Sequence, residues 1–236
     1  MSETGYGQFC PVAMAAEILC PRWTLVLLGE MLSGSTRFNE IRRGVPRMSP
    51  ALLSKRLKEL EDAGVAERTQ KADGVPTYHL TERGMDLQPI ISSIGGWAQK
   101  WIDSDVAMDN LDVQLLMWNM RRNLNPNPMP KHKVVIQFIY PELPPTQRNW
   151  WLIIEPGAEV DLCSLDPAHD VDLYVTADLK AMTKAWMGHS TFQQEIEAET
   201  IMLTGDRTLA RSIDVWIGES SLACKFMSEP TKALTA

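Results

Sequence analysis

Residues 38–80 constrain the fold of this chain most, because helix, turn and strand signals follow one another there in a fixed order. Ser49-Pro50 is a helix start, with Ser49 as the N-cap and Pro50 at the first helical position, where the missing N–H costs nothing. The apolar positions that follow recur at steps of three or four residues: Leu53, Leu57 and Leu60. Gly64 suits a left-handed C-terminal cap. A shorter helix before the turn completes a helix-turn-helix.

A β-hairpin is expected directly after this helix. Its strands are predicted at residues 65–70 and 77–80, where β-branched and aromatic residues gather. Asp73-Gly74 supplies the turn chemistry between them. Two strands after a helix-turn-helix predict the wing of a winged helix.

The same stretch is basic in an acidic chain. Residues 37–58 hold seven Lys or Arg and one acid, a local net charge of +6 against −7 for the whole chain. Such a patch suits a polyanion, since each neutralised phosphate releases a condensed counterion. Residues 1–105 carry 12 basic and 13 acidic side chains, and residues 106–236 carry 11 and 17. We therefore expect two modules with different partners.

The second helix of a helix-turn-helix places its N-terminal half against base edges in the major groove. That rule makes Ala51, Ser54 and Lys55 candidate base contacts, while Arg47 and Lys58 are candidate phosphate contacts. Arg68 and Lys71 in the wing could reach flanking phosphates. The predicted DNA-binding set is Arg47, Ser49, Ala51, Ser54, Lys55, Lys58, Arg68 and Lys71. The alternative is a solvated helix face whose charges only aid solubility.

Residues 10 to about 101 resemble the HxlR family of bacterial winged-helix transcription regulators. The matching elements stand in the family's order: Cys10-Pro11-Val12, Arg22-Trp23, residues 37–41, Ser49-Pro50, residues 53–60 with Gly64, and Pro76-x-Tyr78-x-Leu80-Thr81-x-x-Gly84. The resemblance implies a homodimer on a pseudo-palindromic operator in double-stranded DNA. It also implies an interface built from the N-terminal segment and the helix after the wing.

That later helix has a wide apolar face, which agrees with this expectation. Its members recur at three- and four-residue steps: Leu87, Ile90, Ile91, Ile94, Trp97, Ala98 and Trp101. The alternative is that the face packs only within its own subunit.

Cys10 precedes Pro11 at a helix entry, where the positive end of the helix dipole lowers a thiol pKa. Several proteins of the HxlR type use a cysteine here to sense oxidants or electrophiles, so Cys10 is a redox candidate. The alternative is a small residue that caps the helix and reacts with nothing. Whether Cys20 could resolve an oxidised Cys10 depends on geometry.

A polar link at residues 103–110 leads into the second module, for which we predict helices at 111–122, 178–187 and 206–217. Strands are predicted at 134–139, 150–154, 160–163, 171–175 and 200–203, with the short turns typical of an antiparallel sheet. The best-matching segments are Asp172–Thr176, Leu179–Gly188 and Thr200–Leu209, and on these the block resembles the lipid-binding domain of sterol carrier protein type 2. The predicted fold class is thus α+β: a winged helix-turn-helix at 1–105 for DNA binding and dimerisation, and a sterol-carrier-protein-like α/β domain with an antiparallel-rich sheet at 106–236.

Domains of the sterol-carrier type hold an apolar ligand between sheet and helices. The candidate lining residues are Trp150, Leu152, Trp186, Met187, Phe192, Met202, Leu203 and Trp216. Thirteen Met and eight Trp favour a pliable apolar pocket. Each of these residues could equally belong to an ordinary core.

Other classes of function lack support in the sequence. The sequence shows no Ser, His and Asp in the order of a catalytic triad, no phosphate-binding glycine loop and no recognisable pair of catalytic carboxylates. We therefore expect no enzymatic activity and no catalytic residues. The four cysteines form no CxxC and no histidine clusters with them, so we expect no metal and no cofactor. No apolar run approaches 18 residues and no secretory signal stands at the N-terminus, so we expect a cytoplasmic protein that does not enter membranes.

The sequence therefore predicts a dimeric DNA-binding transcription regulator modulated by an apolar or amphipathic small molecule. A second hypothesis is a thiol redox switch at Cys10, with the second module structural. A third is a lipid-transfer or accessory protein whose winged helix binds a protein partner.

Overall fold

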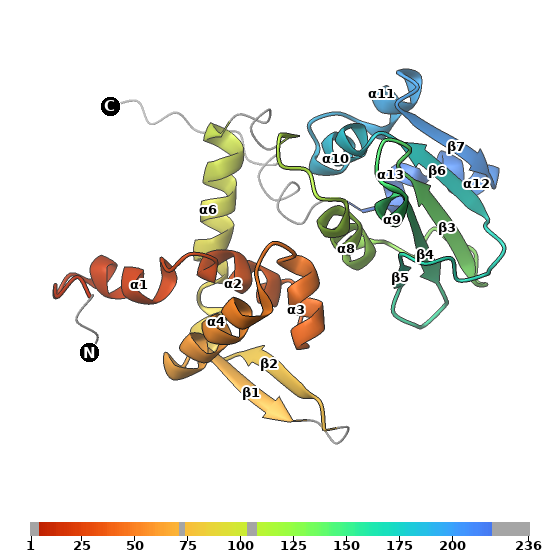
Figure 1. The fold of residues 1–236 in the computed structure, drawn as a ribbon. Coiled ribbons are helices and arrows are strands. Elements are labelled where there is room, and N and C mark those ends of the chain that lie inside the picture. Colours follow the sequence, from red (N-terminus) through yellow and green to blue (C-terminus); the bar gives the residue numbers. More distant parts are fainter. Residues whose placement is uncertain (1–4, 71–73, 103–107, 219–236) are drawn as a thin grey trace. The chain divides into compact units, whose positions relative to one another are not determined.

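The computed structural model describes residues 5–70, 74–102 and 108–218, and the chain divides into two compact units, 1–98 and 99–236 (Figure 1). The first unit is mainly helical with a two-stranded hairpin. The second is a five-stranded sheet with helices. Each unit has its own apolar core.

The helices of the first unit precede and follow its hairpin. They are α1 (Pro11–Leu19), α2 (Thr24–Leu32), α3 (Phe38–Gly44), α4 (Pro50–Asp62), α5 (Glu82–Met85) and α6 (Gln88–Trp101), the last of which runs past the division between the units. The hairpin strands are β1 (Ala66–Gln70) and β2 (Pro76–Leu80). Figure 1 shows α2, α3 and α4 gathered together, with the hairpin below them and α1 projecting away.

The α3–α4 pair and its caps confirm the predicted helix-turn-helix. The Ser49 hydroxyl accepts the Leu52 N–H at the start of α4. Gly64 has φ +67 after the last turn, and the Val65 N–H donates to the Leu60 carbonyl, which satisfies an orphan acceptor. The leucine stripe of α4 is fully buried in a core that also contains residues of α2 and α3. Local capping and tertiary packing therefore fix the same helix boundaries.

The hairpin is antiparallel and is anchored to the segment before α3. Ala66 pairs with Leu80, and Gln70 pairs with Pro76. The Tyr78 N–H donates to the Thr36 carbonyl, and Arg37 forms an isolated antiparallel bridge with Thr77, so the segment before α3 adjoins β2. This attachment holds the wing beside the helix-turn-helix.

The second unit is a mixed sheet in the order β5-β4-β3-β6-β7. Its strands are β3 (Val134–Ile139), β4 (Asn149–Ile154), β5 (Asp161–Cys163), β6 (Leu173–Ala177) and β7 (Ile201–Gly205). Its helices are α8 (Val113–Asn123), α9 (Pro145–Arg148), α10 (Leu179–Met187), α11 (Phe192–Glu197), α12 (Arg207–Arg211) and α13 (Ile213–Trp216). Three strand pairs are antiparallel, whereas β3 and β6 are parallel.

Several predicted elements of the second unit need correction. The expected helix at 206–217 breaks at Ser212 into α12 and α13, and β6 begins two residues later than expected. The sheet is rich in antiparallel pairs, as predicted, although β6 returns beside β3 in the same direction. The short helices α9 and α11 were not predicted. Alternate strand residues, including Ile136, Leu152 and Val175, form one large core with the helices.

Within the described ranges, no single helix is long and apolar enough to cross a membrane. Only α1 and α2 taken together, with a bend of 79° between them, reach that length and composition.

Candidate nucleic-acid interface

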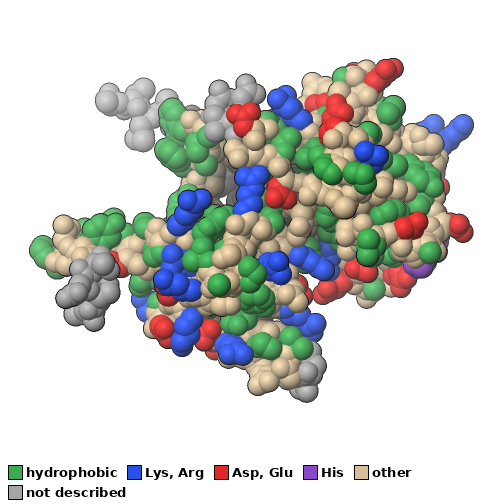
Figure 2. All heavy atoms as spheres, viewed as in Figure 1, with side chains coloured by type: hydrophobic (Ala, Val, Ile, Leu, Met, Phe, Trp, Pro, Cys, Tyr) green, Lys and Arg blue, Asp and Glu red, His purple; other side chains and the backbone are tan. Residues whose placement is uncertain are grey.

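The exposed face of α4 carries most of the predicted DNA contacts. Seven of the eight predicted residues are described, and all seven are exposed: Arg47, Ser49, Ala51, Ser54, Lys55, Lys58 and Arg68. The eighth, Lys71, lies outside the described residues. Lys and Arg side chains gather over this part of the first unit in Figure 2. The helix thus presents a continuous polar surface opposite its buried leucines.

Two serines of α4 are already engaged by the helix. Besides the Ser49 cap, the Ser54 hydroxyl donates to the Pro50 carbonyl over 3.0 Å. A hydroxyl has two acceptor lone pairs, so Ser54 can still accept a hydrogen bond while its proton is used. At a base edge, the Ser54 hydroxyl would therefore accept a hydrogen bond from a donor group, such as an exocyclic amine.

Both lysines of α4 pair with acids one turn further along. Lys58 Nζ lies 2.8 Å from Asp62, and Lys55 Nζ lies 4.0 Å from Glu59. The hydrogen bond from Lys58 to Asp62 raises the pKa of the Lys58 ammonium. A phosphate that binds Lys58 must displace this carboxylate.

Arg56 belongs to the packing of the first unit rather than to its open face. Its side chain is only 14% exposed, its Nε donates to the Arg22 carbonyl over 3.0 Å, and its guanidinium pairs with Glu59. Arg56 therefore ties α4 to the turn before α2. Arg56 therefore adds to the positive charge of residues 37–58, but its side chain holds the first unit together and is not exposed with the other cations.

Glu30 was not singled out in the sequence, and it is buried in the first unit. It accepts a hydrogen bond from the Ser35 hydroxyl over 2.5 Å, and its carboxylate lies against Gly44 at the end of α3. A Cβ at Gly44 would overlap this carboxylate. An acid within an otherwise apolar helix is the only sequence signal that could have indicated this contact.

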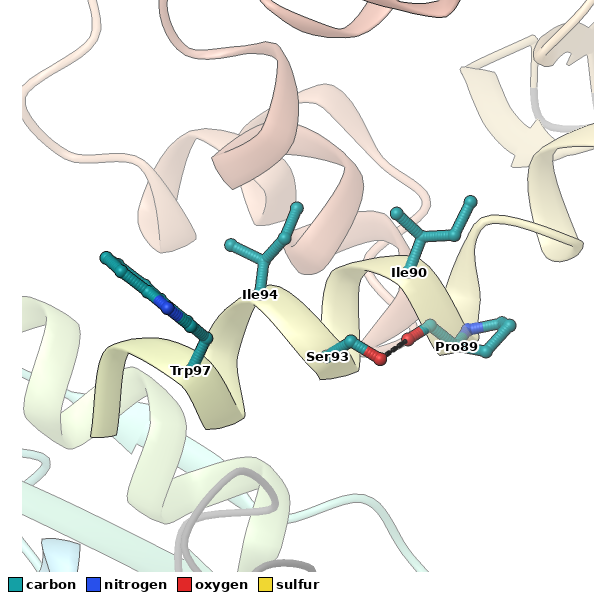
Figure 3. A pocket seen from close by; sticks show the side chains of 5 residues that line it. All are labelled: Pro89, Ile90, Ser93, Ile94 and Trp97. Carbon is teal, nitrogen blue, oxygen red and sulfur yellow. Dashed lines mark hydrogen bonds between the residues drawn. The ribbon is translucent and has the colours of Figure 1, made fainter. Parts of the chain in front are cut away.

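The helix α6 presents an apolar strip on its outer side. Leu87 and Ile91 pack against the core of the first unit, whereas Ile90, Ile94 and Trp97 are 44–61% exposed. These three line a shallow surface pocket with Pro89 and Ser93, as Figure 3 shows. The predicted apolar face is therefore divided, with one edge inside the subunit and the other exposed.

The helix α1 also has no buried residue, and Val12 and Met14 on it are exposed. Contiguous exposed apolar surface on a soluble protein marks an interaction site. The exposed Ile90, Ile94 and Trp97 on the outer side of α6 are called the apolar strip below.

Cys10 and Cys20 stand at opposite ends of α1, as its N-cap and C-cap. The backbone amides of Ala13 and Val12 lower the pKa of the Cys10 thiol, although the sulfur makes no full capping hydrogen bond. Ten residues of helix place the two cysteines about 15 Å apart, whereas a disulfide needs Cα atoms about 4.4–6.8 Å apart. Cys20 therefore cannot resolve an oxidised Cys10 of the same chain while α1 is intact.

The predicted pocket residues of the second unit converge on its core, with one exception. Trp150, Leu152, Trp186, Phe192 and Trp216 are buried in a single cluster. Partly buried Met187 and Leu203 pack against that cluster. Met202 is 53% exposed, because it alternates with Ile201 and Leu203 along β7 and lies on the other face of the sheet.

The described residues contain no group of three or more His, Cys, Asp or Glu arranged to hold a metal ion.

The first unit is thus a winged helix-turn-helix, and comparison with known proteins identifies its family. Residues 18–106 match the family model for the HxlR-like helix-turn-helix. The chain is 41% identical over 103 residues to the uncharacterized HTH-type transcriptional regulator YvaP of Bacillus subtilis, covering 41% of this chain and 92% of that protein. It is 34% identical over 98 residues to the HTH-type transcriptional regulator YodB of the same organism, covering 40% and 87%.

The chain therefore belongs to the HxlR family. Among solved structures, the reduced form of the transcriptional regulator YodB from B. subtilis shares 31% identity and has a TM-score of 0.37, covering 41% of this chain and 98% of that one. The resemblance of the second unit to sterol carrier proteins stays a prediction.

Proposed function

We propose that this protein is a transcription regulator that binds double-stranded DNA through α4 and the wing. The observation that carries the proposal is the exposed face of α4, which presents Ala51, Ser54, Lys55 and Lys58 while the leucine stripe is buried. In a helix-turn-helix such a face enters the major groove. The family relatives, which are named as HTH-type transcriptional regulators, support the same reading.

Charge assigns different roles to the two ends of α4. No acid lies between Glu40 and Glu59, so the N-terminal half of α4 can approach base edges without facing a carboxylate. Ala51 and Ser54 are short and suit close contact with bases, and Lys55 is long enough to reach a guanine edge. Arg47 and Lys58 flank this half and would hold phosphates, as would Arg68 and Lys71 from the wing.

We further propose that two copies of the chain associate through the apolar strip and bind a pseudo-palindromic operator. The exposed Ile90, Ile94 and Trp97 support this proposal, because water contact is unfavourable for side chains of this size. A two-fold dimer places two α4 helices against half-sites about one helical turn apart. The first module would then serve both DNA binding and dimerisation.

The test selects operators from a random duplex library with the full-length protein and then measures affinity for the enriched sequence. We expect two related half-sites in inverted orientation and a strong decrease in affinity with salt. A double variant, Arg47→Ala with Lys55→Ala, should lose binding, whereas Lys180→Ala, at an exposed position of α10, should keep it. No measurable affinity for any duplex at low salt would contradict the proposal, and protein partner binding would then be the better explanation of the winged helix.

For the second module we propose binding of an apolar or amphipathic small molecule in a sterol-carrier-like domain. What supports this is the composition of its core, where three tryptophans meet partly buried Met187 and Leu203. Occupancy can alter DNA affinity only if the ligand binds one dimer geometry better than the other. Lipid-transfer activity independent of DNA would contradict a regulatory role for this module.

A second candidate function is a thiol redox switch, and the lowered pKa of Cys10 is the observation that favours it. Because Cys20 is about one helix length away, oxidation would have to link Cys10 to a small thiol or to another chain. An oxidant response of DNA binding that survives Cys10→Ser would exclude this candidate.

A further inference from the structure

The strand β7 forms one edge of the sheet in the second unit. It stands at the end of the sheet order and pairs with β6 on one side, and the described residues place no strand on its other side (Figure 1). The Asp178 N–H donates to the Thr200 carbonyl over 3.0 Å, and the Asp206 N–H donates to the Asp172 carbonyl over 2.8 Å. Because backbone direction alternates along a strand, residues 200, 202, 204 and 206 direct their N–H and C=O groups towards β6.

The backbone groups of Ile201, Leu203 and Gly205 consequently point away from the sheet. Among the described residues, no hydrogen bond to these outward groups is found. Native proteins protect such an edge with Lys or Pro residues, with a bulge or with a covering segment. Residues 201–205 contain no charged residue and no Pro, and Met202, Thr204 and Gly205 are exposed. The edge is therefore able to accept another strand.

The sequence around β7 is complementary to a second copy of itself. Antiparallel pairing about a two-fold axis at Leu203 sets Leu203 opposite the partner's Leu203 and Ile201 opposite the partner's Gly205, so every outward group is paired. Moving the axis to Met202 or Thr204 would leave one outward residue opposite a residue outside the strand.

Charge favours the same register. It brings Glu199, just before the strand, towards the partner's Arg207, just after it, and the two-fold axis repeats this pair. Both side chains are exposed, and neither forms an ion pair with another residue in the described part of the chain. Opposite charges across paired strands stabilise the pairing, whereas like charges oppose it. A second copy of this chain therefore fits the edge better than an unrelated strand.

We propose that β7 pairs with β7 of a second copy of this chain, which joins the two five-stranded sheets into one. The pairing covers part of the exposed Met202 with the partner's Thr204. The five residues that each strand contributes are far fewer than the roughly 20–30 per side of a standard interface. The inference therefore rests on the proposed dimer of the first unit, which holds two chains together and raises the local concentration of the strands.

Disulfide cross-linking tests the register directly. The pairing sets Met202 opposite the partner's Thr204 as a non-hydrogen-bonded pair, with Cα atoms about 4.5 Å apart, a separation that a disulfide can span. Two copies of residue 202 lie on a diagonal, roughly 7–8 Å apart, which is too far. Full-length Met202→Cys and Thr204→Cys, each with the four native cysteines replaced by Ser, are mixed and oxidised with copper phenanthroline. We expect the mixture to cross-link severalfold faster than either variant alone.

The charge pair and the choice of edge each have their own variant. Arg207→Glu should slow cross-linking of the mixture severalfold, and addition of Glu199→Arg, which exchanges the two charges, should restore it. Tyr174→Cys mixed with Met202→Cys is the matched control, since Tyr174 is exposed on β6 but lies one strand away from the edge. This control mixture should not cross-link.

Two measurements separate the pairing of β7 from the dimer on which it rests. Equal cross-linking rates in the mixture and in each variant alone would overturn the proposed register. In sedimentation velocity at the same concentration, a dimer that gives no cross-link would overturn the pairing of β7 alone. A monomer would overturn the dimer proposed for the first unit as well.

Discussion

The ion pair between Lys58 and Asp62 gives a quantitative test of the proposed DNA contact. If Lys58 neutralises a phosphate, removing it lowers the slope of log K against log salt concentration by about 0.9 for each half-site. A dimer on two half-sites would lose about 1.8 from the slope. At 0.1 M salt, that change corresponds to roughly 60-fold weaker binding if counterion release is the only term.

The pair also predicts the opposite effect of a neighbouring change. Asp62 holds Lys58 at 2.8 Å in the free protein and must be displaced on binding. Asp62→Asn removes that competition, so it should strengthen binding to any duplex. Because phosphate contacts carry no sequence information, a mixed-sequence duplex of about three helical turns suffices and no operator is needed.

The assay is fluorescence anisotropy of a labelled duplex at several salt concentrations, with Lys58→Ala, Asp62→Asn and Lys180→Ala. The last variant removes the same charge from an exposed position of α10 and controls for net charge. An unchanged slope in Lys58→Ala would refute the contact. A slope lowered equally by Lys180→Ala would show that only the overall field matters.

Three further predictions concern stability, thiol chemistry and association. Gly44→Ala should lower the free energy of unfolding by about 1–3 kcal/mol, because its Cβ would overlap a buried carboxylate. Gly29→Ala is the control, since its Cβ would meet only an ordinary contact at 3.8 Å. In thermal unfolding, this control variant should be as stable as the original protein or more stable. Alkylation of Cys10 is measured in a variant where it is the only cysteine. The alkylation rate should reach half its maximum at lower pH in the folded than in the urea-unfolded chain, since backbone amides stabilise the thiolate. Equal midpoint pH values in the two states would remove the basis for a redox role. Ile94→Glu should shift the protein towards monomer in sedimentation velocity, and the equally exposed Val215→Glu should not; an unchanged sedimentation coefficient in both would contradict dimerisation through the apolar strip.

Much of the first unit could be predicted because its signals are local. The cap at Ser49, the leucine stripe and the left-handed Gly64 lie within one helix, and each is a property of a few consecutive residues. The contacts that were missed join residues far apart in the sequence. Arg56 bonds to a carbonyl 34 residues earlier, and Glu30 of α2 meets Gly44 at the end of α3. Charge counting alone cannot distinguish such a structural cation from an exposed one.

The second unit was harder to predict for the same physical reason. Strand positions follow from local composition, but the parallel pairing of β3 with β6 depends on where the chain returns after two hairpin strands. A one-residue shift decides which face a strand residue occupies, and this separates exposed Met202 from buried Ile201.

The distribution of charge along α4 bears on specificity as well as affinity. The basic stretch at 37–58 ends where Glu59, Glu61 and Asp62 begin, so the helix is neutral to basic at its N-terminal half and acidic beyond it. A phosphate backbone that approached the whole helix sideways would meet these carboxylates and be repelled. A groove that admits only the N-terminal half avoids them. The acids therefore disfavour non-specific poses more than the proposed one, which raises the ratio of specific to non-specific binding. Neutralising Glu61 should lower that ratio, because it should strengthen non-specific binding more than specific binding.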